Sequence, residues 1–378
     1  MFVRIATTLV LIVSLTAHAQ DRAERLLEEL TNAPGISGHE GEVRKIVLRE
    51  LRAAGAEATT DGLGSAIGTF AGPAGSPRIM LAAHMDELGL LVKHITSDGF
   101  VKFLPTGGWL DQALVDKRWV IHTSKGRVIG VSGIKTVHVS RAEDRTRVFP
   151  RDDLFLDVGV KSSAEAEALG IRAGDSITPD VRFTRLGNGD AYAAKAFDDR
   201  LGIAVMLEAV RRVSSMKHPN TIVAVGTVQE EVGLRGARTS SQLVKPDVGI
   251  AVEVGVAGDY PGMGADLAQE RLGDGPGIFL HDSSMIPNRK LVDLVFDAAK
   301  AKGIPLQPEL LAGYGEDASE MQRWFTGTPA INLTVPVRYL HSFQGVIRRD
   351  DFDRAVELLV DVLMRLDGKT VEALKAFD

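Results

Sequence analysis

Apolar residues along the first and last parts of the chain alternate between two periodicities. Short, continuous apolar runs, which are typical of buried strands, cover residues 78–83, 221–228, 248–254, 277–281 and 330–335. Apolar stripes at helical spacing cover residues 201–212, 288–302 and 351–366. This alternation predicts an α/β fold with a mixed, mainly parallel sheet and helices on both faces.

Two local signals place further elements near the start of this fold. The dipeptide Asp61-Gly62 within residues 56–70 predicts a β-hairpin. Ser37 and Glu40 stand three positions apart, just before an apolar stripe that begins at Val43. This spacing predicts a capping box, in which the Ser37 hydroxyl caps a helix and the Glu40 carboxylate reaches back to it.

The middle of the chain, residues 89–187, follows a different pattern. Short β-like runs alternate with turns, and only one helix is indicated, after the capping pair Ser162 and Glu165. We therefore expect a small β-rich domain inserted into the α/β fold. The α/β domain would then comprise residues 20–88 and 188–378.

The first residues form a separate segment. One positive charge at Arg4 precedes an almost wholly apolar run from Ile5 to Leu15, and Ala17-His18-Ala19 fits a small-x-small cleavage site. Residues 1–19 therefore predict a secretory signal peptide and a periplasmic or secreted protein, since the run is too short to span a membrane. The alternative is the hydrophobic N-terminus of a cytosolic protein.

Composition narrows the class of partner. The chain has 378 residues, of which 44% are hydrophobic, enough for a large core and two or three domains. A net charge of −6 argues against a nucleic-acid partner, which needs a basic face. Because the chain has no Cys, disulfides cannot stabilise it, so stability must come from the core and from any oligomer that it forms.

Candidate chemistry is concentrated in five short segments that carry His or carboxylate side chains. Most of them follow a predicted strand, and ligands of open α/β sheets bind at the carboxyl ends of strands. Histidine and carboxylates without Cys suit a zinc hydrolase, and two metal ions need one carboxylate that bridges them. The segments are AHMDELG with His84, KAFDDRLG with Asp198, QEEVGLRGA with Glu230 and Glu231, AVEVG with Glu253, and RYLHS with His341.

Each of these residues also has an ordinary structural interpretation. A single His such as His84 or His341 is more often a core or loop residue, and Asp198 could simply cap a helix. Glu253 ends an otherwise apolar strand, where a carboxylate is costly unless it is paired or bound to metal. Asp86 follows His84 by two positions and could accept the other imidazole N–H.

The adjacent pair Glu230 and Glu231 suggests a division of labour. Two consecutive side chains cannot point to the same side of a strand, so the two carboxylates are expected to do different work. One would bind a metal ion, and the other would hold the attacking water and move its proton. A solvated pair of loop residues is the ordinary alternative.

Together, these motifs resemble the tetrahedral (TET) aminopeptidase family of dinuclear zinc peptidases, also labelled glutamyl aminopeptidase or endoglucanase. The flanking segments APGISGHE and LDVGVKSSAEAEALGIRAGD and the strand IPLQPE agree as well, so the resemblance covers nearly the whole chain after the N-terminal segment. It implies two divalent metal ions, zinc or cobalt, bridged by Asp198. It further implies a general acid/base at Glu230, support for His84 from Asp86, and a complete ligand set of His84, Asp198, Glu231, Glu253 and His341.

The resemblance also implies an assembly. The inserted β-rich domain would be the family's dimerisation domain, and dimers of this family often build a hollow twelve-subunit tetrahedron. A homo-oligomer is therefore expected.

Four features depart from the family pattern. Glu253 stands where the family usually has Asp, and a Gly-Gly-Thr-Asp loop that borders the substrate is replaced here by Gly313-Tyr314-Gly315-Glu316-Asp317. The family usually has an acidic residue shortly after the position of His341-Ser342, and this chain has Gln344 near that position instead. The apparent signal peptide is atypical as well, because many relatives are cytosolic.

The sequence thus predicts a metallo-aminopeptidase that acts on peptides with a free N-terminus through a bridging water and the Glu230 general base. A related deacylase of N-acyl amino acids needs the same metals and is the main alternative. A non-catalytic binding protein on the same fold is a further one. Serine catalysis is disfavoured because no G-x-S-x-G motif is present.

Overall fold

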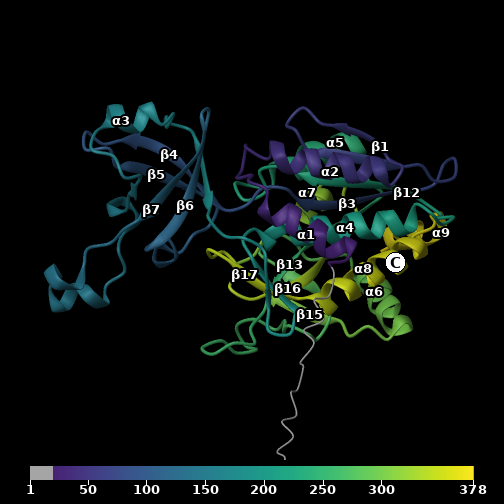
Figure 1. Ribbon diagram of the computed structural model, residues 1–378. Coiled ribbons are helices and arrows are strands. Elements are labelled where there is room, and N and C mark those ends of the chain that lie inside the picture. The colour runs from purple at the N-terminus through teal and green to yellow at the C-terminus, as the bar shows by residue number, and fades with distance from the viewer. Residues whose placement is uncertain (1–19, 378) are drawn as a thin grey trace, which may run out of the picture.

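The computed structural model describes residues 20–377, so the predicted signal peptide at residues 1–19 lies outside the described part of the chain. Figure 1 shows two lobes. A large sheet with helices forms the right-hand lobe, and a smaller β-rich lobe with strands β4 to β7 lies at the left.

A mixed sheet forms the centre of the larger lobe. Its four middle strands, β12, β3, β13 and β16, run parallel to one another. Strand β2 pairs antiparallel with β12, and β14 pairs antiparallel with β16. In spatial order, the eight strands found among residues 20–377 are β1 (Glu57–Thr60), β2 (Ala66–Phe70), β12 (Thr221–Thr227), β3 (Arg78–His84), β13 (Val248–Val256), β16 (Ala330–Val337), β14 (Gly277–Asp282) and β15 (Gln307–Leu311).

The mixed sheet predicted from the apolar runs is therefore confirmed. Alternate residues of β3 enter two separate apolar clusters, with Leu81 in one and Met80 in the other. The Leu81 cluster also contains the apolar stripes of α1, α2, α4, α6 and α8, whereas the Met80 cluster contains Val244 of α5 and Met321 of α7. The helices of this lobe are α1 (Arg22–Asn32), α2 (Gly41–Ala53), α4 (Phe197–Val213), α5 (Arg235–Val244), α6 (Arg289–Lys302), α7 (Ala318–Gln322), α8 (Arg349–Arg365) and α9 (Gly368–Lys375).

The smaller lobe is a closed barrel in the order β4-β5-β8-β7-β6-β9. Trp119 is fully buried in its apolar core, and the rings of Trp109 and Phe343 pack edge-on against it with centroids 5.7 and 5.1 Å away. The elements of this lobe are β4 (Gly89–Ile95), β5 (Val101–Thr106), β6 (Lys117–Thr123), β7 (Gly126–Ser132), β8 (Leu156–Asp157), β9 (Ser176–Pro179), the helix α3 (Ser163–Ala168), and the 3-10 turns η1 (Asp111–Ala113), η2 (Val137–Val139), η3 (Ala142–Thr146) and η4 (Arg151–Asp153).

Phe343 comes from the loop after β16, so its packing on Trp119 ties the barrel to the α/β lobe. A small sheet of β10 (Thr184–Leu186), β11 (Ala191–Ala194) and β17 (Gly345–Arg348) follows the barrel in the chain. Strand β11 of this sheet is followed in the chain by α4, which starts at Phe197. The chain that leaves the barrel therefore leads directly to the carboxyl edge of the large sheet.

The predicted capping box at Ser37 is wrong in its hydrogen bonds. Helix α2 begins at Gly41 with Glu40 as its N-cap residue. The Ser37 hydroxyl instead donates to the Asp86 carboxylate at 2.6 Å, and Glu40 accepts the backbone N–H groups of Gly38 and Gln229. As an N-cap, Ser37 would have to accept a backbone N–H at the helix start, but the helix begins four residues later, and its hydroxyl donates a charge-assisted hydrogen bond to Asp86. In the second capping pair, Ser162 accepts from the Glu165 N–H at the start of α3 as predicted, whereas the Glu165 carboxylate accepts the N–H of Lys161, one residue before Ser162.

Within residues 20–377, none of the helices combines the length and hydropathy needed to cross a membrane.

Candidate metal centre

The seven candidate residues gather at one edge of the large sheet. His84 is the last residue of β3, and Glu253 lies in the neighbouring strand β13. Glu230 and Glu231 follow the end of β12, and His341 follows β16. Because these four strands are adjacent and parallel, their carboxyl ends meet at the same edge, and the start of α4 brings Asp198 there too.

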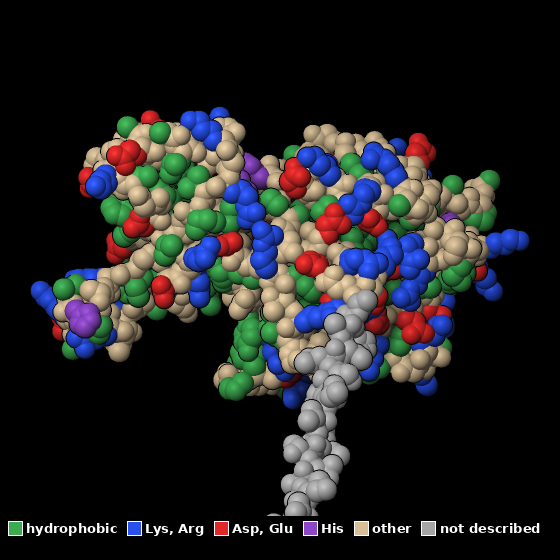
Figure 2. All heavy atoms as spheres, viewed as in Figure 1, with side chains coloured by type: hydrophobic (Ala, Val, Ile, Leu, Met, Phe, Trp, Pro, Cys, Tyr) green, Lys and Arg blue, Asp and Glu red, His purple; other side chains and the backbone are tan. Residues whose placement is uncertain are grey.

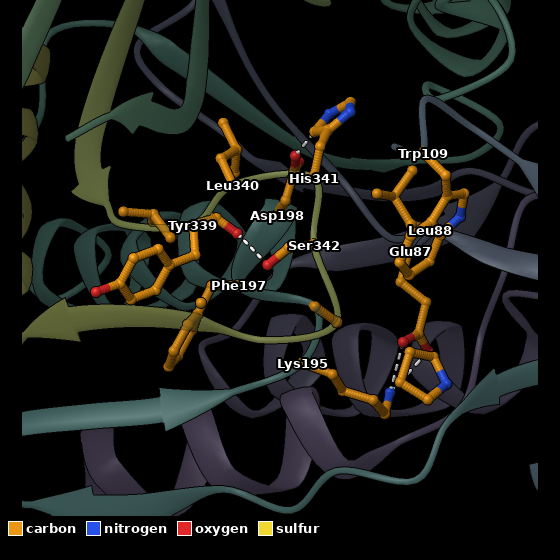
Figure 3. Close-up of a pocket in the computed structure, with 14 residues that line it drawn as sticks. Glu87, Leu88, Trp109, Lys195, Phe197, Asp198, Tyr339, Leu340, His341 and Ser342 are labelled. Carbon is orange, nitrogen blue, oxygen red and sulfur yellow. Dashed lines mark hydrogen bonds and ion pairs between the residues drawn. The ribbon is translucent and has the colours of Figure 1, made fainter. Parts of the chain in front are cut away.

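Asp198 lies between the two histidines. Its Oδ1 is 2.8 Å from Nε2 of His84, and its Oδ2 is 3.3 Å from Nε2 of His341. Figure 3 shows the His341 and Asp198 side chains directed at each other. Each oxygen of one carboxylate therefore faces a different histidine, which is the arrangement that a bridging ligand requires.

The remaining carboxylates divide between the two histidines. Glu253 Oε1 lies 3.5 Å and Glu230 Oε2 lies 3.9 Å from Nε2 of His84. Glu231 Oε2 lies 3.9 Å from Nε2 of His341. The structure thus brings together all five predicted ligands and Glu230.

The site is closed on the His84 side and open on the His341 side. His84 and Glu253 are 1% and 2% exposed, whereas the His341 side chain is 40% exposed. A cavity of about 260 Å³ begins at these residues and is lined also by Leu234, Tyr314 and Glu316. A substrate can therefore reach the carboxylates from the His341 side.

Asp86 has a different set of contacts from the one expected. The Nδ1 of His84 lies 3.0 Å from the backbone carbonyl of Asp86 and 3.6 Å from its carboxylate. The Asp86 carboxylate instead accepts the backbone N–H groups of Glu230 and Glu231, at 3.0 and 3.2 Å, and the Ser37 hydroxyl. Asp86 therefore holds the turn that carries both glutamates, and its backbone orients the histidine ring.

Burial makes this group of carboxylates electrostatically expensive. It raises the pKa of Glu231 to about 8 and raises the pKa values of Glu230 and Glu253 well above their ordinary range. Burial opposes ionisation of Asp198 as well, but hydrogen bonds from His341 and His84 lower its pKa below the usual value. One oxygen of Glu231, Oε1, is buried without a hydrogen-bond partner among the described residues.

This donor set fits divalent cations. Two groups of three potential ligand atoms lie close together, namely His84 with Asp198 and Glu231, and His84 with Asp199 and Glu253. Imidazole nitrogen and carboxylate oxygen are the donors that zinc takes in hydrolytic sites. Positive ions would also compensate the buried negative charge that the protein itself leaves unbalanced.

Asp199 is a residue of this site to which the sequence assigned no role. Its carboxylate is fully buried and accepts the backbone N–H groups of His84 and Gly202, at 3.0 and 2.9 Å. It therefore ties the end of β3 to the start of α4. In the sequence, the two adjacent aspartates of KAFDDRLG pointed to this role, but such a pair does not reveal which of them accepts backbone N–H groups.

A buried ion pair beside the site was not predicted either. Lys195 Nζ contacts both carboxylate oxygens of Glu87 at 2.7 Å, and Arg200 lies 3.6 Å from the same carboxylate (Figure 3 shows Lys195 and Glu87). Arg200 also donates to the backbone carbonyls of Leu30 and Gly35. Because Lys195 and Arg200 flank Asp198 in the chain, these contacts hold the segment that carries it.

Residues 64–358 match the family model of the M42 glutamyl aminopeptidases. The lysyl aminopeptidase of Pyrococcus furiosus is 36% identical, with 90% of this chain and 96% of the relative covered. The glutamyl aminopeptidase of Lactococcus lactis is 32% identical, with 93% and 98% covered.

Solved structures agree with these relatives. A TET aminopeptidase from a Thaumarchaeota archaeon of marine sediment superimposes with a TM-score of 0.91 and is 39% identical, covering 93% of this chain and 98% of that one. The TET1 peptidase of Pyrococcus horikoshii, described as assembling into a tetrahedron or a large octahedral shell, has a TM-score of 0.82 and 32% identity, with 91% and 100% covered.

These matches correct one prediction. The periplasmic or secreted location is wrong, because the chain matches, over about nine-tenths of its length, TET aminopeptidases of a typically cytosolic family. The prediction depended on residues 1–19, which lie outside the described part of the structure. A short apolar run after one positive charge is a weak signal, since the hydrophobic N-terminus of a cytosolic protein has the same pattern.

Proposed function

The chain belongs to the M42 family of glutamyl aminopeptidases, and on that premise we propose that it removes N-terminal residues from peptides by means of two divalent metal ions. The observation that carries this proposal is the position of Asp198 between His84 and His341, with one carboxylate oxygen toward each. Zinc fits the donor set, and cobalt is the alternative ion.

The proposed ligands follow from the distances around the two histidines. Asp198 would be shared between the ions. His84 and Glu253 would complete one site, and His341 and Glu231 would complete the other. When bound, the ions would polarise the scissile carbonyl and lower the pKa of a water between them. Glu253 is longer than the Asp usual in the family, and its carboxylate nevertheless lies 3.5 Å from His84.

Glu230 is the proposed general acid/base. Its carboxylate lies beside His84 at the wall of the cavity, and its backbone N–H is held by Asp86. Burial raises its pKa well above the ordinary range, which suits a group that must both accept and return a proton near neutral pH. Glu230 would take the proton of the attacking water and deliver it to the departing amine.

The site is exposed on one side only, and this favours an exopeptidase. His84, Asp199 and Glu253 close the inner end of the site, so a peptide can enter only with a chain end or a loop from the His341 side. The excess of carboxylates there would attract a positively charged α-amino group rather than a C-terminal carboxylate. We therefore infer that the substrate is a peptide with a free N-terminus.

The test is hydrolysis of a peptide library by the full chain loaded with zinc or cobalt, in which half of the peptides carry free N-termini and half acetylated ones. Stepwise release of N-terminal residues from the free half alone is expected, and removal of metal by a chelator should abolish it. Release of acetate from the blocked half would favour the deacylase. Metal-loaded protein that turns over neither half would favour the binding protein.

Glu230→Gln separates catalysis from metal binding. We expect kcat to fall by about 100- to 10,000-fold, the usual contribution of a positioned acid/base, while the bound metal measured by mass spectrometry stays unchanged. Glu357→Gln on the surface of α8 is the matched control and should behave as the unmodified protein. Full activity of the metal-loaded Glu230→Gln protein would contradict the assignment.

A homo-oligomer is part of the proposal. The related TET1 peptidase is described as forming closed shells, and the barrel of this chain carries exposed apolar side chains at Ile129, Val131 and Ile134. Exposed apolar patches of this kind mark interaction surfaces. We propose that the barrel is a dimerisation surface and that dimers build the larger assembly, with a dodecamer as the expected form.

A further inference from the structure

Glu316 is a buried carboxylate that the proposed reaction does not use. It lies in the loop between β15 and α7 and lines the same cavity as His84, Glu230 and Glu253. The residue is 1% exposed, and within residues 20–377 neither of its carboxylate oxygens has a hydrogen-bond partner. A buried carboxylate without any partner is costly, so the position needs an explanation.

Hydrogen bonds and ring stacking hold the backbone of this loop, and they thereby fix the position of Glu316. The Tyr314 hydroxyl donates to the Val254 carbonyl at 2.9 Å, and the Tyr314 ring stacks on Phe279 with centroids 5.1 Å apart. The Ser283 N–H donates to the Tyr314 carbonyl at 2.7 Å. The carbonyl of Glu316 itself accepts from Ser319 at the start of α7.

The surroundings of Glu316 are negative. Burial raises its pKa well above the ordinary range, and the nearby carboxylates of Glu253 and Asp282 raise it further. Asp282 is satisfied, because its oxygens accept from Ser284, Met285 and Asn332. Glu316 has no such donors, and it belongs to neither of the metal-ligand groups found in the described chain. A cationic group of a bound molecule would compensate this buried carboxylate.

A second cavity shares Asp198 and His341 with the first but offers no comparable acceptor. The carboxylate that lines this second cavity alone, Glu87, is already bound on both oxygens by Lys195, as Figure 3 shows. The cavity of Glu316 also provides apolar surface at Leu234 and Tyr314, against which an aliphatic stem can lie. A long side chain with a cationic end would match both features.

We propose that Glu316 determines substrate specificity by accepting the side-chain ammonium or guanidinium group of a Lys or Arg at the N-terminus of the peptide. This inference rests on the proposed aminopeptidase function and names the substrate class for the same site. The next residue, Asp317, accepts the Thr227 hydroxyl at 2.5 Å, so it has a partner among the described residues, which Glu316 lacks.

The test compares peptides that differ only in the first residue, which is Lys, Arg, norleucine or Leu. For the metal-loaded full chain, kcat/KM should be higher for Lys and Arg than for norleucine, which has the same stem without the charge. Glu316→Gln keeps the shape and removes the charge, and should lower the Lys-to-norleucine ratio by about 10- to 100-fold, as expected for a charge-assisted hydrogen bond. Hydrolysis of the norleucine peptide should change little.

Two further variants sharpen the comparison. Glu316→Asp should restore part of the Lys preference, because it returns the charge at a shorter reach. Glu320→Gln removes a carboxylate from the same short helix, but one that Arg323 already pairs at 2.6 Å. This control should leave the ratio unchanged.

Several results would overturn the proposal. Equal rates with Lys and norleucine would do so, and so would a Glu316→Gln effect of the same size on every peptide, which would indicate a role toward the α-ammonium group. Failure to cleave any peptide would count against the proposed function instead. Calorimetry with lysinamide and norleucinamide then tests Glu316 separately: binding of lysinamide that Glu316→Gln weakens supports the proposal, and equal binding of the two amides contradicts it.

Discussion

At the scale of single residues, Glu270 shows what complete burial does to a carboxylate outside the candidate site. Its Oε1 accepts the Thr334 hydroxyl, whereas its Oε2 has no hydrogen-bond partner in the described part of the chain. Burial raises the pKa of Glu270 to about 8. The folded protein therefore retains a proton on this side chain at pH values where the unfolded chain, with an ordinary pKa of 4.5, has lost it.

This difference predicts a pH-dependent stability. Between pH 4.5 and 8 the folded state binds the extra proton, so the contribution of Glu270 to stability falls as pH rises. In Glu270→Gln, which keeps the shape and the Thr334 contact, that loss should vanish. The variant should gain on the unmodified protein by about 1.4 kcal/mol per pH unit across this window.

The measurement is urea unfolding of both proteins at pH 5, 6, 7 and 8. Glu357→Gln, which removes a half-exposed carboxylate, should run parallel to the unmodified protein at every pH. A gap between Glu270→Gln and the unmodified protein that stays constant with pH would show that Glu270 is ionised in the fold.

At the scale of elements, the contact between α4 and β13 sets the spacing of the site. Asp198 and Asp199 have non-helical backbone angles, so the regular helix begins only after them, close to the predicted start at Leu201. At Gly202, a Cβ atom would lie 2.1 Å from the Val252 carbonyl oxygen and 2.3 Å from Asp199 Oδ1. Only Gly allows the helix to approach β13 so closely, and this approach brings Asp198 toward Glu253.

Gly202→Ala should therefore push α4 away from β13. We expect a loss of about 1–3 kcal/mol in the free energy of unfolding, the usual cost of overpacking, together with weaker zinc binding. Thermal unfolding and metal content after dialysis measure the two effects.

The matched control is Gly368→Ala in α9, where the added Cβ meets no described atom within 4 Å apart from its chain neighbours and its own helix backbone. This change should be neutral or should stabilise the protein by up to about 1 kcal/mol, because Ala is the better helix former. Unchanged zinc affinity in Gly202→Ala would mean that the helix position does not govern the site.

At the scale of the whole molecule, the exposed apolar side chains of the barrel indicate an interface. Figure 2 shows hydrophobic side chains, in green, on the face of the barrel lobe at the left. Ile129 and Val131 of β7 are 43% and 41% exposed and border a groove that also contains Phe100 and Phe155. Burial of this groove against another subunit would remove the apolar surface from water.

The double change Ile129→Asp with Val131→Asp should lower the assembly to smaller species, because each buried carboxylate would oppose association. Light scattering after gel filtration gives the mass, and circular dichroism checks that the fold is kept. Met216→Asp, at an exposed apolar residue of the other lobe, should leave the mass unchanged. An unaltered mass in the barrel variant would place the interface elsewhere.

Much of this organisation follows from the sequence alone. Both ends of strands β3, β12, β13 and β16 and of helices α6 and α8 lie within two residues of the predicted ranges, because one-sided or complete burial imposes a regular apolar pattern. The positions of His84, Glu230 and Glu231 at or after strand ends were visible for the same reason. Helices α1 and α9 were not predicted, although α1 also carries an apolar stripe, including Leu26, Leu27 and Leu30.

Partners across the fold were decided only by the tertiary structure. Lys195 and Glu87 are 108 positions apart, and Ser37 binds Asp86 rather than the end of its own helix. Within residues 20–377, the lack of a hydrogen-bond donor beside Glu316 is likewise set by how β13, β14 and the loop that Tyr314 anchors pack together. Periodicity reports which side chains are buried, since burial is repeated along each element. It does not report which distant polar group meets which, because that depends on how the elements pack, and this is where the specificity of the site resides.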